Sequence, residues 1–144
     1  VWELASTLEP LCAQLAAQRI TQDELAALEF NLVKTEELVK TGQSPVSVTI
    51  GFQSLVAEAS HNQALLLARA PVSLLMQSGY ASIAPLIPQS GARLLKAHRQ
   101  VFEALKAHDE KEAVNWTRKH LEDYRRGFEW TGLNFDDPIA ASTP

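Results

Sequence analysis

Two histidines in the last third of the chain, His98 and His120, lie where they could bind a ligand. Each has apolar residues four positions before and after it, so each belongs to the apolar face of a helix rather than to a solvated one. If these helices form a hairpin about the turn at His108 and Asp109, the histidines are nearly equidistant from that turn and face each other across the core. Neutral imidazoles both donate and accept hydrogen bonds, and they ligate metals.

Other polar residues share edges of apolar helix faces. Thr49 and Gln53 are four residues apart, beside Phe52, and Ser73 and Gln77 form a second such pair. Polar side chains that converge on an apolar core are typical of a small-molecule pocket. A core histidine with a single hydrogen bond is the simpler alternative for each imidazole. The predicted ligand-binding residues are Thr49, Gln53, His98, His120, Ser73 and Gln77.

Catalytic patterns are weak in this sequence. Glu58 and His61 make the single Glu-x-x-His, whereas a di-iron bundle needs that motif on two helices and further glutamates. There is no Gly-x-Ser-x-Gly and no phosphate-binding glycine loop. We expect no enzyme activity and no catalytic residues, and a helical metal-binding bundle protein or enzyme stays as the alternative.

The composition fits one domain of moderate size. The 144 residues are 46% hydrophobic, and 13 basic against 17 acidic residues give a net charge of -4, the wrong sign for binding phosphates unaided. Cys12 lies among leucines at helical spacing and is expected to be a buried apolar residue. No apolar run is long enough to span a membrane, and no signal peptide is evident, so we expect a cytoplasmic protein. The start at Val1 suggests a fragment or a processed product.

The first half of the chain predicts three helices. Apolar spacing favours a first helix over Trp2–Arg19, with a stripe of Leu4, Leu8, Leu11, Cys12 and Leu15. A capping box of Thr21 and Glu24 begins a second helix that ends at Thr41 and Gly42. Ser44 and Pro45 then suit the N-cap and first position of a third helix.

The second half predicts three more. One runs from Asn62 to Met76, with a kink or break at Pro71, and residues 79–88 read as a loop. Ser90 is expected to cap the next helix. Asp109 is expected to cap the last helix and to form a capping box with Glu112. The sequence therefore predicts an all-α antiparallel bundle of six to seven helices, with a domain over residues 1–130 and an irregular tail over 131–144.

Three stretches carry a resemblance to a known family. Residues 52–62 resemble a phenylalanine-histidine followed by an alanine-glutamate-alanine-serine-glycine-asparagine stretch, and residues 8–19 resemble the family's first helix. The spacing of its last two helices is matched by His98, Val101, Ala104, Leu105, Asp109, Ala113, His120 and Leu121. By their order and spacing, the chain is identified as similar to the FadR C-terminal domain of the GntR family of bacterial transcription regulators.

The resemblance implies a bundle of six or seven helices around a pocket for small carboxylates, often bound through a divalent metal held by one aspartate and three histidines. This sequence departs from that pattern. Thr49 stands in place of the aspartate, Gln53 in place of one histidine, and Ala5 where many members have an arginine. His61 replaces a glycine and is expected to be a surface C-cap residue. A helical domain of another regulator family is an alternative.

The polar residues and the resemblance together imply a regulatory function. The chain should sense a small organic effector, which could carry a carboxylate, and should form a homodimer. DNA binding is expected only through an N-terminal winged helix-turn-helix module that is absent from these residues. No cofactor is expected; weak binding of a divalent metal by His98 and His120 is the residual possibility.

Overall fold

The computed structural model describes residues 1–133, and these are all-helical, as the sequence predicts. None of the described helices is long and apolar enough to cross a membrane. The described elements are α1 (Trp2–Arg19), α2 (Gln22–Lys40), α3 (Val46–Glu58), α4 (Gln63–Ile83), the short 3-10 helix η1 (Ala84–Leu86), α5 (Ser90–Lys106) and α6 (Glu110–Thr131).

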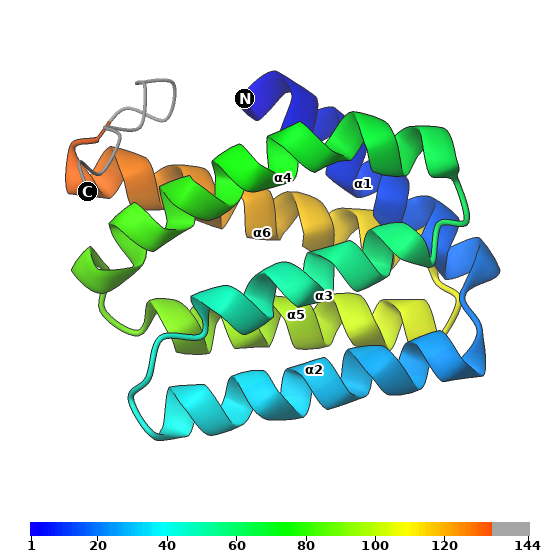
Figure 1. The fold of residues 1–144 in the computed structure, drawn as a ribbon, viewed down its shortest axis with the longest axis horizontal. Helices are drawn as coiled ribbons and strands as arrows, with labels where there is room; N and C mark the ends of the chain where they lie inside the picture. The colour runs from blue at the N-terminus through cyan, green and yellow to red at the C-terminus, as the bar shows by residue number, and fades with distance from the viewer. Residues whose placement is uncertain (134–144) are drawn as a thin grey trace.

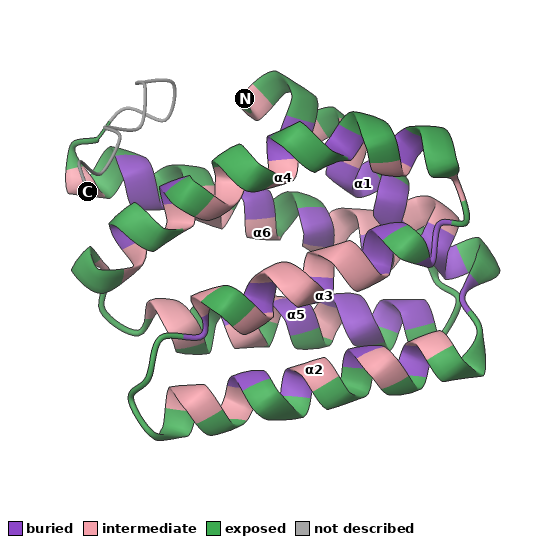
Figure 2. Ribbon diagram, in the orientation of Figure 1, coloured by how far each residue is buried: buried purple, intermediate pink, exposed green. Residues whose placement is uncertain are grey.

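The helices form an antiparallel bundle (Figure 1). In that view α3 and α4 lie in front of α5 and α6, and α2 runs along the lower edge. Helix α1 packs along α6, α5 also packs along α6, and α2 packs on both α3 and α5. Buried residues line the inner side of each helix, whereas the outer sides of α2 and α4 are exposed (Figure 2).

The main apolar cluster occupies the part of the bundle between α1, α2, α3, α5 and the first turns of α6. Small side chains on α1 allow larger ones on the other helices to approach it closely. We refer to this cluster as the apolar core. Its buried members are Ala13, Ala16, Ala17, Ile20, Leu25, Leu28, Leu32, Phe52, Val56, Ala59, Val101, Phe102, Ala104, Leu105 and Ala113.

The stripe expected on α1 is partly wrong. Leu4 is 57% exposed and Leu11 40% exposed, while the residues that α1 buries are mostly alanines, together with Glu9, Pro10 and Cys12. Alanine does not indicate which face of a helix is buried, because it occurs on both faces. The expected stripe was therefore defined mainly by leucines. Cys12 is buried, as expected, and burial raises the pKa of its thiol to about 12.

The helix ends follow most of the capping signals. Thr21 accepts from the Glu24 backbone N–H, and the Glu24 carboxylate accepts from the Thr21 N–H at 2.8 Å, which confirms the capping box. Asp109 caps α6 by accepting from the N–H of Glu112. The second hydrogen bond of the expected capping box, from the Asp109 N–H to the Glu112 carboxylate, is not formed, so that part of the prediction is wrong. The Glu112 carboxylate instead accepts from the Asn115 amide on the next turn.

The region around α4 departs furthest from expectation. The helix continues through Pro71 without a break and extends to Ile83, so residues 79–83 are helical rather than loop. Pro71 lies on the exposed side of α4, where water can hydrogen-bond to the carbonyl that loses its N–H partner. Only residues from Ala84 onward leave the α-helix, through η1.

Two further caps differ from the sequence expectation. Gln89, with φ 57, is the N-cap of α5, and the Ser90 hydroxyl donates to the Ala84 carbonyl instead of capping the helix. Helix α3 begins at Val46, with Pro45 as its N-cap, one residue later than expected. Helix α6 ends at Thr131, and the irregular tail expected over residues 131–144 lies mostly outside the described residues.

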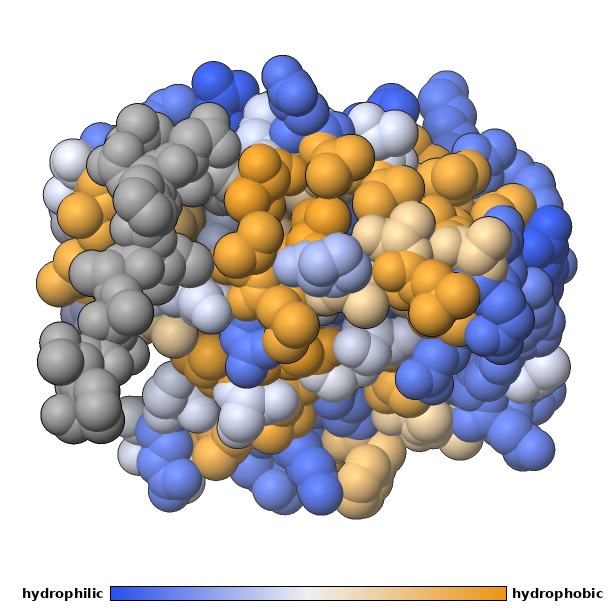
Figure 3. Space-filling model, turned by 45° about the horizontal axis from the view of Figure 1, so that its top comes forward, coloured by the Kyte–Doolittle hydropathy of each residue, from blue (hydrophilic) through white to orange (hydrophobic). Residues whose placement is uncertain are grey.

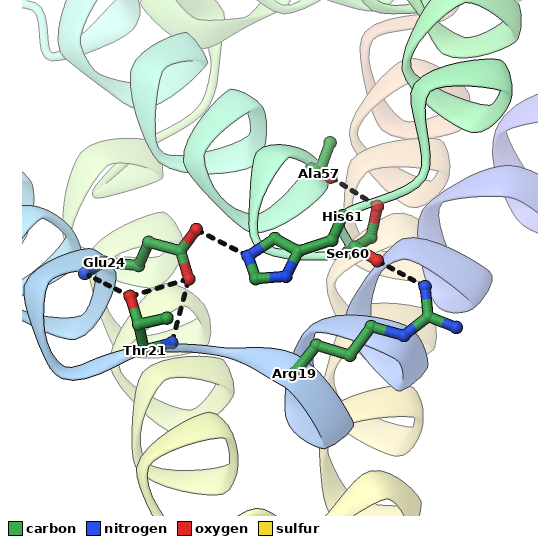
Figure 4. Close-up of polar contacts among 6 residues, drawn as sticks. All are labelled: Arg19, Thr21, Glu24, Ala57, Ser60 and His61. Atoms are coloured by element: carbon green, nitrogen blue, oxygen red, sulfur yellow. Dashed lines mark hydrogen bonds and ion pairs between the residues drawn. The ribbon is translucent and has the colours of Figure 1, made fainter.

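A polar corner joins the α1–α2 connection to the α3–α4 connection (Figure 4). His61 Nε2 lies 2.8 Å from Glu24 Oε1, and Arg19 donates to the Ser60 carbonyl oxygen at 2.7 Å. His61 is exposed, as expected, and has φ 50, but the C-cap of α3 is Ala59, so the expected capping role of His61 is wrong. Partial burial raises the pKa of Glu24, but hydrogen bonds from Thr21 and His61 outweigh this and leave that pKa below its ordinary value.

Candidate functional site

A cavity of about 80 Å³ lies between α1, α3, α4 and α6. We call it the inner cavity. A single water needs only ~10–15 Å³ by this kind of measure, so the space holds several waters or a small organic group. Five of the six predicted ligand-binding residues line it: Thr49, Gln53, His120, Ser73 and Gln77.

His98 does not line the inner cavity but lies directly behind it. Its Nε2 is 3.3 Å from the Gln53 amide nitrogen, and its ring stacks on Phe52 at 4.2 Å between centroids. The His98 and His120 rings are 4.9 Å apart and nearly perpendicular. The expected juxtaposition of the two histidines is therefore confirmed, with His120 at the cavity wall and His98 in the layer beneath.

Both imidazoles are neutral at ordinary pH. Burial lowers the pKa of His98 well below its usual value, and the nearby His120 lowers it further. Burial also lowers the pKa of His120 to about 4, although the carboxylate of Asp123 opposes this effect. His98 Nδ1 is buried and has no hydrogen-bond partner among residues 1–133. The pair can therefore exchange hydrogen bonds with a ligand, mainly through His120, but supplies no positive charge.

The residues at this site do not fit the metal-binding set that the resemblance implies. The Thr49 hydroxyl donates to the Pro45 carbonyl oxygen at 2.7 Å, and Gln53 contacts His98. Within residues 1–133, no group of three or more histidine, cysteine, aspartate or glutamate side chains is placed to hold a metal ion. Two imidazoles without a carboxylate lack the charge and the number of ligands of a usual zinc site.

A buried ion pair, which was not predicted from the sequence, forms part of the cavity wall. Arg69 Nε on α4 lies 2.8 Å from Glu9 Oε1 on α1, and both side chains are less than 10% exposed. Burial raises the pKa of Glu9, although the Arg69 guanidinium opposes this effect. One signal was available in the sequence: Arg69 is the single charged residue in the 21 residues of α4.

Ala5, which stands where the resemblance implies an arginine, does not line the cavity. Ala5 is fully buried and packs in a small apolar cluster with Val72 and Leu121. The cation of this pocket therefore comes from α4 rather than from the first turns of α1.

A second, wider pocket opens beside the inner cavity. It measures about 370 Å³ and lies between the end of α4, η1, α5 and α6, and we call it the outer pocket. Arg93 and Asp123 form an ion pair in its wall. Both cavities are lined by Tyr80, Leu94, His120 and Tyr124, which therefore form the partition between them.

The helical bundle with a polar cavity matches a known domain. A family model for the FCD domain matches residues 1–123. The chain belongs to the FCD domain family. This family is regulatory, which agrees with the resemblance seen in the sequence. No curated protein matches the sequence.

One solved structure supports the assignment of fold and family. The FCD chain is similar to "Streptococcus agalactiae GntR", with 27% sequence identity and a TM-score of 0.69. The match covers 87% of this chain and 56% of that one, so the FCD chain spans little more than half the length of this relative.

Proposed function

We propose that this FCD domain is the effector-sensing half of a GntR-type transcription regulator, and that its inner cavity binds a small organic molecule. The observation that supports this most directly is the convergence of polar side chains from α3, α4 and α6 on one cavity. In this proposal, ligand binding changes the geometry of the domain and so controls DNA binding by a separate N-terminal module.

A cavity-filling variant tests the sensing role. Ser73→Leu places an isopropyl group in the cavity in place of a hydroxyl, whereas Ser78→Leu makes the same change on the exposed side of α4. A panel of small organic acids, amides and alcohols is screened by thermal shift, and the cavity variant should lose the response that the control keeps. Ligands that still bind Ser73→Leu as they bind the wild type would refute the proposed site.

We further propose that the domain forms a homodimer through the exposed side of α4 and the adjoining part of α1. Figure 3 shows hydrophobic side chains gathered on one face of the molecule. The exposed large hydrophobic residues of α4 are Leu67, Leu74 and Leu75, and those of α1 are Leu4 and Leu11. Because the only charged residue of α4 is buried, its 21 residues present no exposed charge. An uncharged face can pack on a copy of itself about a two-fold axis without opposing like charges.

Charge insertion tests this interface. Leu67→Glu and Leu74→Glu, combined, should weaken dimerisation by a hundredfold or more, as roughly expected when like charges are opposed across an apolar contact. Val33→Glu is the control, because Val33 is a similarly exposed apolar residue on α2, at the opposite edge of the bundle. Sedimentation that finds the wild type monomeric at micromolar concentration would contradict the proposal.

A further inference from the structure

We propose that a groove between α5 and α6 binds the phosphate backbone of double-stranded DNA, next to the site that the N-terminal module of the regulator reads. This inference rests on the regulatory role proposed above, but it concerns a different surface from the inner cavity. The groove measures about 500 Å³, and all of its lining residues lie on α5 or α6. We call it the basic groove.

The basic residues of the chain are gathered on these two helices. The net charge of -4 is an average over the whole sequence, in which 13 lysine and arginine residues face 17 acidic ones. Helix α2 carries five acidic residues and two lysines. Nine of the 13 basic residues lie on α5 and α6: Arg93, Lys96, Arg99, Lys106, Lys111, Arg118, Lys119, Arg125 and Arg126. The sign of the net charge therefore does not describe the surface of α5 and α6.

Within the basic groove, positive charge exceeds negative charge. Its charged lining residues are five basic and two acidic ones: Arg93, Lys96, Arg118, Lys119, Arg126, Glu122 and Asp123. Asp123 forms an ion pair with Arg93, whereas the other four basic side chains form no ion pair with a carboxylate of residues 1–133. These four are exposed. Their charges are therefore available to an anionic partner.

The unpaired cations suit an extended anion better than a small one. Arg118 and Arg126 are eight residues apart on α6, which is about 12 Å along the helix axis. One strand of DNA presents a phosphate about every 3.4 Å along its axis, so roughly three or four phosphates pass over that length. Lys96 lies on the opposite wall, on α5. A single phosphate ion is too small to reach both ends of this row.

The groove favours the backbone of a duplex over exposed bases. Proteins bind single-stranded nucleic acids largely by stacking bases on aromatic side chains. Trp116 is the single tryptophan, tyrosine or phenylalanine that lines the groove, and the Lys119 ammonium lies over its ring, 4.4 Å from the centroid. That ring face is therefore already covered. Contacts to phosphates alone hold DNA without reading its sequence.

The basic groove stays accessible in the homodimer proposed above. That interface uses the exposed side of α4 and the adjoining part of α1, and no residue of either helix lines the groove. In Figure 1, α5 and α6 lie behind α3 and α4. A dimer therefore presents two grooves, related by the two-fold axis of the assembly.

Fluorescence anisotropy with a labelled 24-base-pair duplex tests the inference on the 144-residue protein. At about 50 mM salt we expect a Kd of roughly 10–100 µM, within the range of sequence-independent DNA binding. The logarithm of the association constant should fall linearly with the logarithm of the salt concentration, with a slope of about -3, because roughly three or four phosphates are neutralised. Absence of binding at this salt concentration, or tighter binding of a separated single strand than of the duplex, would overturn the inference.

A triple variant locates the contact. Lys96→Gln, Arg118→Gln and Lys119→Gln, combined, should weaken duplex binding by roughly tenfold or more and reduce the slope to about -1. All three residues are exposed, so the variant should fold as the wild type does. An unchanged slope in this variant would place the DNA contact elsewhere and refute the proposed groove.

The matched control changes the net charge equally but outside the groove. It combines Lys34→Gln, Lys40→Gln and Lys106→Gln, all at exposed positions, and should change the Kd by less than about threefold. Equal losses in the two triple variants would reveal a general effect of charge and contradict the inference. Glu122→Gln removes a negative charge from the groove and should tighten duplex binding about threefold.

The outcomes separate this inference from the proposed function. The duplex experiment contains no effector, and none of the groove variants changes a residue of the inner cavity. If the duplex does not bind while Ser73→Leu abolishes the ligand response, the sensing role stands and this inference fails. If the duplex binds as described and Ser73→Leu blocks nothing, the basic groove stands and the sensing role fails.

Discussion

The apolar core and the inner cavity share helix α3 but are built in opposite ways. On one face of α3, Phe52 and Val56 pack into the apolar core, and on the adjoining face Thr49 and Gln53 line the cavity. The core is filled by close-packed alkyl and aromatic groups, while the cavity retains unfilled space and a buried ion pair in its wall. One helix thus separates the region that stabilises the fold from the region that is open to a ligand.

Substitutions in the two regions should therefore have different effects. In the close-packed core, each methylene group that is removed lowers the free energy of unfolding, because it leaves an empty space. Shortening a polar side chain beside an existing cavity creates little new empty space and should lower the stability less. Stability should therefore depend on the core and ligand binding on the cavity, with His98 at the border contributing to both.

The largest expected effect is at Phe52. Phe52→Ala should lower the free energy of unfolding by about 3–5 kcal/mol, because the side chain is fully buried and its removal leaves a cavity. Ser73→Ala, in the cavity wall, should change it by no more than about 0.5 kcal/mol. Urea unfolding of the two variants and the wild type measures both. Similar losses at the two positions would remove the distinction between the core and the cavity.

A smaller effect is expected from the histidines at the border. Both have folded-state pKa values below the ordinary 6.5, so as pH falls below about 6.5 the unfolded chain takes up protons that the folded one does not. The free energy of unfolding should then fall by about 1 kcal/mol per pH unit for each histidine, and the contribution of His120 should end near pH 4.

The variant His98→Gln isolates one of these two contributions. Chemical unfolding between pH 7 and about pH 4.5 should show a shallower dependence in the variant, by about 1 kcal/mol per pH unit. Groups such as Glu9, whose raised pKa acts in the opposite direction, remain in both proteins and largely cancel in the difference. Parallel pH dependences would show that His98 does not titrate as its burial requires.

Far from both regions, the polar corner should matter little. His61→Ala breaks the contact with Glu24 and keeps a positive φ, so a loss of about 0.5–1 kcal/mol is expected. His61→Gly loses the same contact but removes the strain of the left-handed backbone, so its stability should lie within about 0.5 kcal/mol of the wild type. A glycine variant less stable than the alanine variant would be inconsistent with this account.

The smallest expected effect is that of metal on the wild type, which should be none. Zn²⁺ or Ni²⁺ at ordinary trace levels should not bind. Thr49 stands where the resemblance implies a charged aspartate ligand, and Gln53 stands where it implies a histidine ligand. Elemental analysis after purification without chelator measures this. Near-stoichiometric metal that disappears in a His98→Ala, His120→Ala variant would contradict the prediction. Thr49→Asp combined with Gln53→His is expected to create a binding site.

Much of the fold could be predicted because local signals agree with it. The capping box at Thr21 and the cap at Asp109 are formed by residues three apart, and they fix the starts of α2 and α6. The approach of His98 and His120 could be inferred from their distance to a single turn. These inferences need only helix geometry.

The features that could not be predicted depend on contacts between distant segments. Glu9 and Arg69 lie on different helices, and no spacing rule connects them. Helix α4 continues past Pro71 because that residue lies on the exposed side of the helix. A proline in the sequence predicts a break but does not tell which side of the helix it lies on. The exposed leucines of α1 were assigned to the core because periodicity identifies a face but does not say which partner covers it.

The packing of α1 along α6 has a consequence for how the protein is made. Translation delivers helices one at a time, at ~5–20 residues per second, so α1 leaves the ribosome several seconds before the helix it packs on. Until then Glu9, Ala13 and Ala16 lack part of their native surroundings, and the bundle is incomplete on that side. The arrival of the last helix therefore sets the earliest moment at which the whole domain can fold.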